Sequence, residues 1–282
     1  MRRLHERLLA FLCAAAVIAG PAPAAPRRVV STFLCTDEYV FRLLPRERIA
    51  ALSWEATDRH PVVSTIADAA EHIRVIRPST ETVLALKPDL VVMYAGTNPR
   101  LRVNLRSAGV AVLDVPWANS LNDVRAVTAM LGAKFGTPNR ARALLADMDR
   151  KIAAATARAP HPPVGAILYE PQGYASVEGV TDEIMRIAGA VNVAPAGAMT
   201  RTGRLPVEAV IAAAPELLIL GGEARSGAAR AYAVLHHPAL AALGGRTTMA
   251  FANLTPLLCP GPWSLDSAET LGDLARQARK RR

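Results

Sequence analysis

The feature that most constrains the fold is a stretch of almost 40 residues, from Leu121 to Ala159, whose composition favours helix. Its only interruption is Gly136-Thr137-Pro138, which predicts a second helix that begins at Pro138 with Thr137 as its cap. That helix is expected to run for about 20 residues, roughly 30 Å. The segment Pro160-His161-Pro162-Pro163 then ends it. A helix of this length can connect two separate parts of a molecule.

On both sides of this stretch, short apolar runs alternate with helical patterns, which is typical of parallel α/β structure. Strands are expected at residues 28–31, 49–52, 90–93, 110–115, 164–169, 217–220 and 248–252, and helices at 37–44, 182–188 and 267–277. The predicted fold is therefore α/β, with two Rossmann-like lobes joined by a single long helix. The lobes are expected at residues 26–119 and 161–282, and the helical connector at 120–160.

An internal match relates the two predicted lobes. Residues 77–92 and 204–219 align at a constant offset of 127, with Arg, Glu, Val, Ala, Pro and Leu coinciding. Each segment predicts a short helix with a carboxylate in its first turn (Glu81 or Glu208), then a Pro turn and a buried strand. Two explanations remain open: equivalent lobes, or convergence of similar units, since the helix dipole favours Glu in a first turn anyway.

The first 25 residues have the form of a secretory signal peptide. Three arginines precede an apolar run at residues 8–20, and Ala22-Pro23-Ala24 has the small-x-small pattern of a cleavage site. The alternative is a buried N-terminal helix. A cleaved signal places the mature protein in the periplasm. Removing Arg2, Arg3, Arg7 and Glu6 lowers the formal charge from +9 to about +7.

Much of the remaining positive charge sits at the C-terminal end. Five Arg and Lys residues lie between 276 and 282, and such a tail is expected to be solvated. The rest of the surface is close to balanced, so no basic face for nucleic acid is indicated. No apolar run reaches the roughly 20 residues that a membrane-spanning helix needs.

The order of these pieces resembles the periplasmic substrate-binding proteins of ABC importers for cobalamin, ferric siderophores and haem. The resemblance covers about residues 28–278 and rests on residues 79–92, 205–211 and 215–221, with Val177-Glu178-Gly179, residues 184–192 and 237–243 in support. It implies the class III architecture, in which one rigid helix joins two α/β lobes. It also implies that a ligand is captured between the lobes and delivered to a membrane permease and its ATPase, by a protein that is expected to be monomeric.

The resemblance gives Glu81 and Glu208 a specific role. They match the glutamates that sit one on the outer rim of each lobe and contact arginines of the permease. Two exposed carboxylates at a fixed separation can set register and steer association, although exposed ion pairs add little affinity. The alternative is that both are helix-start carboxylates without a partner.

Ligand-binding residues are expected just past the strand ends, where the two lobes face each other. All three Trp and three of the five Tyr fall there, and their flat faces suit a corrin, a porphyrin or a catecholate ring. Four arginines are able to pair with an anionic ligand through their forked donors: Arg100, Arg102, Arg201 and Arg204. Each residue alone has a plainer explanation, as a packed loop side chain or a solvated Arg. The expected ligand-binding residues are Cys35, Thr36, Trp54, Tyr94, Trp117, Tyr169, Tyr174, Arg201, Arg204 and Trp263.

Cys35 and Cys259 are the cysteines expected in the mature protein, since Cys13 lies in the signal. Three interpretations stay open. They can form a disulfide, which an oxidising periplasm permits. They can be soft axial ligands to a haem iron or a corrin cobalt. They can be unrelated, small packed residues.

The sequence does not favour a resident metal or an enzyme. The five histidines expected in the mature protein are dispersed apart from His236 and His237, so no Zn or Mn site of its own is expected. No Gly-x-Ser-x-Gly elbow, P-loop or Gly-x-Gly-x-x-Gly motif is present. We therefore expect a binding protein without a cofactor, whose cargo carries the Fe or Co. The alternatives are a periplasmic sensor or chelate chaperone of the same fold without a transporter, or an α/β enzyme.

Overall fold

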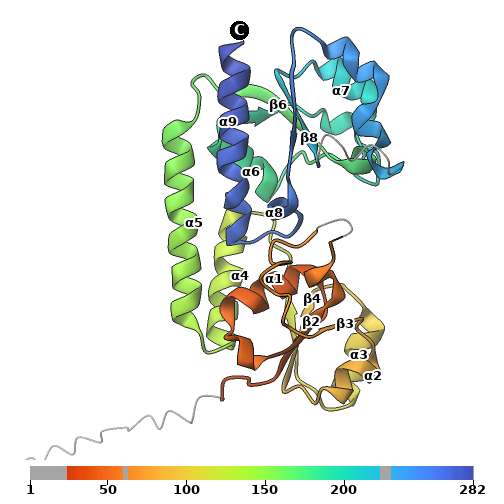
Figure 1. The fold of residues 1–282 in the computed structure, drawn as a ribbon, viewed down its shortest axis with the longest axis vertical. Coiled ribbons are helices and arrows are strands. Elements are labelled where there is room, and N and C mark those ends of the chain that lie inside the picture. Colours follow the sequence, from red (N-terminus) through yellow and green to blue (C-terminus); the bar gives the residue numbers. More distant parts are fainter. Residues whose placement is uncertain (1–23, 60–62, 223–229, 282) are drawn as a thin grey trace, which may run out of the picture.

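The computed structural model describes residues 24–59, 63–222 and 230–281. Residues 1–23, and with them nearly all of the expected signal peptide, lie outside the described residues. Two α/β lobes lie one above the other, and long helices run along one side of them (Figure 1). Within the described part of the chain, no helix is both long and apolar enough to span a membrane.

The first lobe is built on a five-stranded parallel sheet in the order β3-β2-β1-β4-β5. Its inner strands are short buried runs such as Val29–Ser31, as a sheet covered on both faces requires. The four expected strands of this lobe are confirmed, whereas β3 and α3 are additional. The strands are β1 (Val29–Ser31), β2 (Ile49–Ser53), β3 (Val75–Ile76), β4 (Leu90–Tyr94) and β5 (Val112–Val115), and the helices are α1 (Leu34–Leu43), α2 (Thr80–Ala85) and α3 (Pro99–Ser107).

The second lobe has a four-stranded parallel sheet in the order β7-β6-β8-β9. The three expected strands are confirmed, and β7 is additional. The strands are β6 (Val164–Tyr169), β7 (Ala190–Asn192), β8 (Leu217–Gly221) and β9 (Thr248–Ala252), and the helices are α6 (Val180–Ile187), α7 (Val207–Ala213), α8 (Thr255–Leu258) and α9 (Ser267–Lys280). The structure also has 3-10 helices η1 (Arg46–Arg48), η2 (Trp54–Thr57), η3 (Pro171–Gly173), η4 (Ala196–Ala198), η6 (Arg230–His236), η7 (Pro238–Leu243) and η8 (Pro262–Asp266).

The internal match in the sequence falls on equivalent places in the two lobes. It covers α2 and β4 in the first lobe and α7 and β8 in the second. Both β4 and β8 are inner strands, and each is followed in its sheet order by the strand that comes next in the chain. Equivalent lobes therefore explain the match.

The helical connector consists of α4 (Leu121–Lys134) and α5 (Pro138–Arg158), and α5 is the helix that spans the two lobes. The expected second helix is confirmed, since α5 has 21 residues and begins at Pro138. It packs against α1 of the first lobe and against α6 and α9 of the second (Figure 1). Thr137 is at the expected N-cap position, but its side chain does not cap the helix. Thr137 has φ −126° and ψ 47° rather than an extended backbone, and its hydroxyl has no hydrogen-bond partner although it is buried.

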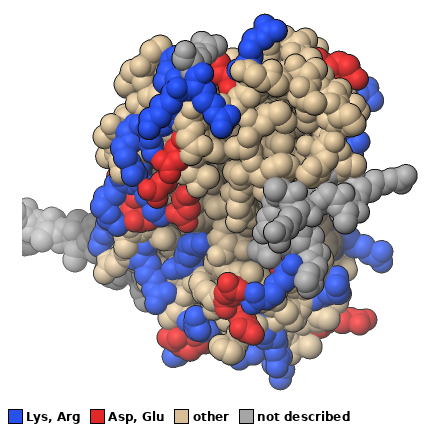
Figure 2. Space-filling model, turned by 45° about the horizontal axis from the view of Figure 1, so that its top comes forward, with Lys and Arg blue, Asp and Glu red and all other residues tan. Residues whose placement is uncertain are grey.

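Two of the C-terminal basic residues, Arg276 and Arg279, are hydrogen-bonded to backbone oxygens at the end of α5 and in its connection to β6. Helix α9 continues to Lys280, and guanidinium groups of Arg276 and Arg279 donate to the backbone oxygens of Arg158 and Pro162. In the view of Figure 2, Lys and Arg side chains gather along one edge of the upper lobe and on the lower lobe, while the broad face of the upper lobe is largely uncharged.

A second crossing between the lobes follows α8. Although this segment belongs in sequence to the second lobe, Cys259 and Trp263 pack in the same hydrophobic core as Val29, Tyr39 and Leu131. Cys259 forms a disulfide with Cys35 in α1, with a Cα–Cα distance of 5.0 Å. Of the three interpretations of the cysteines, the structure has the disulfide. Sulfurs bonded to each other are not available as axial metal ligands.

Candidate functional site: a cavity between the lobes

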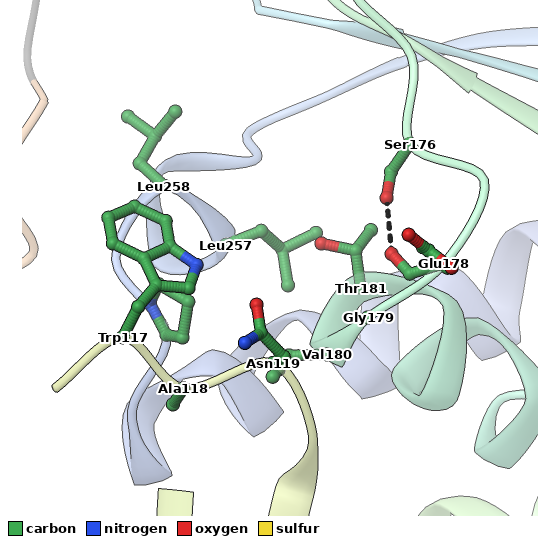
Figure 3. Close-up of a pocket in the computed structure, with 11 residues that line it drawn as sticks. Trp117, Ala118, Asn119, Ser176, Glu178, Gly179, Val180, Thr181, Leu257 and Leu258 are labelled. Atoms are coloured by element: carbon green, nitrogen blue, oxygen red, sulfur yellow. Dashed lines mark hydrogen bonds between the residues drawn. The ribbon is translucent and has the colours of Figure 1, made fainter. Parts of the chain in front are cut away.

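A cavity of about 430 Å³ lies where the lobes meet. This volume is within the range of about 300–1,000 Å³ that is usual for small-molecule sites. Three segments build it: residues 117–119 between β5 and α4, residues 176–181 in the loop before α6 and its first turn, and residues 257–260 at the end of α8 and just after it (Figure 3). Since the first two segments lie in connections that leave the carboxyl ends of parallel strands, the cavity is where an open α/β sheet binds ligands.

Trp117 provides the largest apolar face of the cavity, and its side chain is 51% exposed. Tyr94 packs against its indole in a T-shaped arrangement, at 4.8 Å between ring centroids and 73° between planes. Phe33 in turn stacks on Tyr94 at 5.5 Å. Burial raises the pKa of the Tyr94 phenol to about 12, so this ring stays neutral at physiological pH. The buried rings therefore hold Trp117 in place while one of its faces remains open.

The opposite wall is the loop that leads into α6. Ser176 Oγ donates to the backbone oxygen of Glu178 at 2.7 Å, which holds the loop in a turn (Figure 3). Gly179 precedes α6 with φ 91° and ψ −163°, a conformation that a residue with a Cβ rarely adopts. The loop thereby places Val180 and the Thr181 hydroxyl toward the cavity.

The third wall is the end of α8, and it is attached to the first lobe. Leu257, Leu258 and Pro260 line the cavity, and the Leu258 side chain is 43% exposed. Between them lies Cys259 with its disulfide to α1, and Tyr39 Oη donates to the Pro260 oxygen at 3.2 Å. This apolar wall is therefore held by a covalent bond and a hydrogen bond to the opposite lobe.

The expected ligand-binding residues fall into three groups. Trp117 lines the cavity, and Tyr94 lies directly behind it. A second group is packed away from solvent. Cys35 is in the disulfide, the Thr36 hydroxyl bonds to Ser31 Oγ at 2.7 Å, and Trp263 packs edge-on against Tyr39. Tyr169 is also buried, and its hydroxyl donates to the Leu205 oxygen at 2.8 Å.

The third group lies elsewhere on the lobes, outside the residues that line the cavity. Arg77 stacks over the half-buried Trp54, with its guanidinium carbon 4.1 Å from the ring centroid. Arg204 lies over Tyr174 at 5.3 Å and donates to Gln172 Oε1 at 3.2 Å. Arg201 is exposed.

Most of the residues that line the cavity were missed from the sequence. They are Ala118, Asn119, Ser176, Glu178, Gly179, Val180, Thr181, Leu257, Leu258 and Pro260. Most are small, polar or aliphatic, types that occur in any loop. The sequence could have indicated them only by position, since residues 117–119 come just after strand β5 and residues 176–181 lie where the connection from β6 enters α6.

The two carboxylates expected on the lobe rims are exposed. Glu81 is in the first turn of α2 and Glu208 in the first turn of α7. Neither carboxylate forms an ion pair with the part of the chain that the structure describes. Among the described residues, no three His, Cys, Asp or Glu side chains gather into a group able to hold a metal ion.

The comparisons with known proteins agree with this architecture. A model of the periplasmic binding protein family matches residues 51–244, more than half of the chain. No match to the curated proteins reaches significance.

Similar solved structures include a periplasmic binding protein from Veillonella parvula, with 21% identity, a TM-score of 0.71 and coverage of 89% of this chain and 92% of that one. A periplasmic haem-binding protein from Pseudomonas aeruginosa has 25% identity, a TM-score of 0.64 and coverage of 89% and 93%. A periplasmic vitamin B12-binding protein from Vibrio cholerae has 20% identity, a TM-score of 0.67 and coverage of 91% and 99%. The family and these neighbours are binding proteins rather than enzymes. The chain, with its two lobes, connecting helix and interlobe cavity, belongs to the periplasmic binding protein family.

Proposed function

We propose that this protein captures an iron complex, such as a ferric siderophore or haem, or a cobalamin, in the cavity between its lobes. It then delivers this cargo to the permease of an ABC importer, which an ATPase drives. The protein works in the periplasm after cleavage of residues 1–25. The Fe or Co belongs to the cargo, and the protein contributes no cofactor of its own.

The open indole of Trp117 is the observation that carries this proposal. A large chelate presents a flat or apolar face, and an aromatic ring that neighbours already hold in place loses little entropy when it stacks on such a face. Leu257 and Leu258 extend the apolar surface, and Asn119, Ser176 and Thr181 offer amide and hydroxyl groups for orientation. A cavity with these groups suits recognition of the organic shell of a chelate rather than direct coordination of its metal.

The test is a titration of the purified mature protein with cyanocobalamin, haemin, a ferric trihydroxamate and a ferric tricatecholate. At least one is expected to bind with a stoichiometry of one and a Kd in the micromolar range or below, measured by calorimetry and by quenching of tryptophan fluorescence. Mass spectrometry of the native complex identifies the cargo. If none of the four binds at micromolar concentration, the proposed ligand class is wrong.

Delivery is proposed to use Glu81 and Glu208. Both are exposed, unpaired within the described residues, and placed one on each lobe at matching positions of the internal repeat. A permease with two complementary arginines would contact both lobes at once, so its binding would depend on how the lobes are arranged. Such contacts act mainly through steering and register.

A further inference from the structure

The charges around the cavity indicate which chelates it accepts, an inference that rests on the proposed function. We infer that the cargo is a neutral or cationic chelate and that the site selects against polyanionic ones such as haem and ferric tricatecholates. Among the described residues that line the cavity, the exposed Glu178 is the one with a charged side chain, and none is Lys, Arg or His. The remaining polar side-chain groups are the amide of Asn119, the indole N–H of Trp117 and the hydroxyls of Ser176 and Thr181.

The positive end of α6 is the feature that favours an anion, because Gly179, Val180 and Thr181 line the cavity at its first turn. That end already carries two carboxylates. Asp182, which is 4% exposed, and Glu183 both lie in the first turn. Glu183 Oε2 accepts the backbone N–H of Leu121 at 2.9 Å, and Asp182 pairs with Arg186 one turn along the helix. The partial positive charge of this helix end is therefore offset by the protein's own acidic groups.

The arginines that the sequence suggested for an anionic ligand do not supply the missing positive charge. Arg204 is engaged with Tyr174 and Gln172. Arg102 pairs with Asp114 at 2.7 Å. Neither of these side chains, nor Arg100 or Arg201, is among the residues that line the cavity.

An anion that enters a partly desolvated site needs a charge-assisted partner, and one that meets a carboxylate instead is repelled. The two propionates of haem and the charge of a ferric tricatecholate have no such partner here. A corrinoid whose periphery consists of amides does not need one, because Asn119, Ser176 and Thr181 can bond to amides. A cationic ferric trihydroxamate gains from Glu178 as well.

The test compares Kd values for four probes with the wild-type mature protein: cyanocobalamin, the cationic ferric complex of desferrioxamine B, haemin and ferric enterobactin. At least one of the first two is expected to bind at least tenfold more tightly than either anionic probe. In Glu178→Gln, binding of the cationic probe weakens about fivefold and loses most of its salt dependence. Binding of the anionic probes improves by a similar factor, and that of cyanocobalamin changes less than twofold.

Glu71→Gln is the matched control, since Glu71 is an exposed glutamate of the first lobe that does not line the cavity. It removes the same charge and should leave all four Kd values unchanged. Tightest binding of haemin or ferric enterobactin, or an E178Q variant whose Kd values and salt dependence for the charged probes equal those of the wild type, overturns the charge selection but leaves the proposed function standing. If no probe binds, both the proposed function and the inferred charge selection are wrong.

Discussion

Trp117 illustrates how neighbouring residues turn an ordinary side chain into a binding surface. Its indole is half exposed because Tyr94 and Phe33 pack on one side of it, whereas the other side faces the cavity. An exposed tryptophan costs solubility and usually has a functional reason when it lies in a concave site.

Replacing Trp117 with Ala is expected to weaken binding of the cargo about tenfold or more, because a stacking face and its buried apolar area are lost. Trp117→Phe should retain most of the affinity, since a flat ring remains. Calorimetry with the tightest-binding chelate measures both. Val103→Ala, which removes an exposed apolar side chain on α3, is the control and should leave the Kd unchanged. Equal affinity of W117A and wild type would show that Trp117 does not contribute to binding.

Asp37 is a buried carboxyl whose surroundings favour its neutral form. It is fully buried in the first turns of α1, where Oδ1 accepts the Ser53 N–H at 3.0 Å and Oδ2 bonds to Ser53 Oγ at 2.5 Å. Burial raises its pKa from 3.8 to about 8, although hydrogen bonds with Ser31 and Ser53 act in the opposite direction. In the folded protein the proton thus stays bound at pH values where the unfolded chain has lost it.

This difference makes stability depend on pH with a defined sign. Between pH 4 and pH 8 the folded state holds one proton more than the unfolded state, so the contribution of Asp37 is fully present below pH 4 and is lost as pH rises toward 8. Asp37→Asn keeps both hydrogen bonds with a group that does not titrate. We expect the stability of the wild type relative to D37N, measured by urea unfolding, to fall between pH 5 and pH 8. A difference that is independent of pH would contradict this.

At the scale of elements, the cavity depends on a segment that crosses from one lobe to the other. After α8, the chain places Cys259 and Trp263 in the core of the first lobe, and the disulfide to Cys35 joins residues 224 positions apart. The same segment carries the apolar wall Leu257–Pro260 of the cavity. The lobes are therefore joined at two places, by α5 and by this segment.

Replacing both cysteines, as Cys35→Ser with Cys259→Ser, is expected to lower the free energy of unfolding by about 2–5 kcal/mol, because the unfolded chain is no longer constrained. Denaturant unfolding of the mature protein measures this. Wild type unfolded under reducing conditions should approach the variant. The matched check is a thiol count on unfolded, unreduced wild-type protein: none is expected, whereas two free thiols would exclude the bond.

The elements also differ in how readily the sequence reveals them. Long buried runs such as β6 and β8 are predicted because each consists of apolar residues that both faces of a parallel sheet require. Strand β3 has two residues, one of them exposed, and therefore no pattern to detect. Helix α3 (Pro99–Ser107) buries only two leucines and is otherwise largely polar, so its sequence pattern does not predict a helix.

On the scale of the whole molecule, each lobe carries one exposed glutamate at an equivalent position. Glu81 and Glu208 occupy the same place in α2 and α7, and each lobe has an inner strand that follows its helix. Binding of a partner to both glutamates therefore depends on the distance between the lobes rather than on the chemistry of either lobe.

The double charge reversal Glu81→Lys with Glu208→Lys is therefore expected to reduce uptake of the cargo to background, while each single reversal reduces it partly. Ligand affinity should stay within twofold, because neither side chain lines the cavity. The measurement is accumulation of labelled chelate by cells that depend on this protein, next to calorimetry on the purified variant. Glu71→Lys reverses an exposed glutamate elsewhere on the first lobe and should transport normally. Unchanged uptake by the double variant would exclude the docking role.

The sequence by itself determined the class of the fold, the long helix α5 and the correspondence between the lobes. These depend on patterns within short stretches: apolar runs of strand length, helix-forming composition, and prolines that end helices. The site depends on long-range contacts instead. Only the tertiary structure decided that Trp117 faces a cavity while Trp263 is packed in a core, and that Cys35 lies 5.0 Å from Cys259 between Cα atoms. Which side of a loop meets which other loop is set by how the lobes are joined, and no local pattern records that.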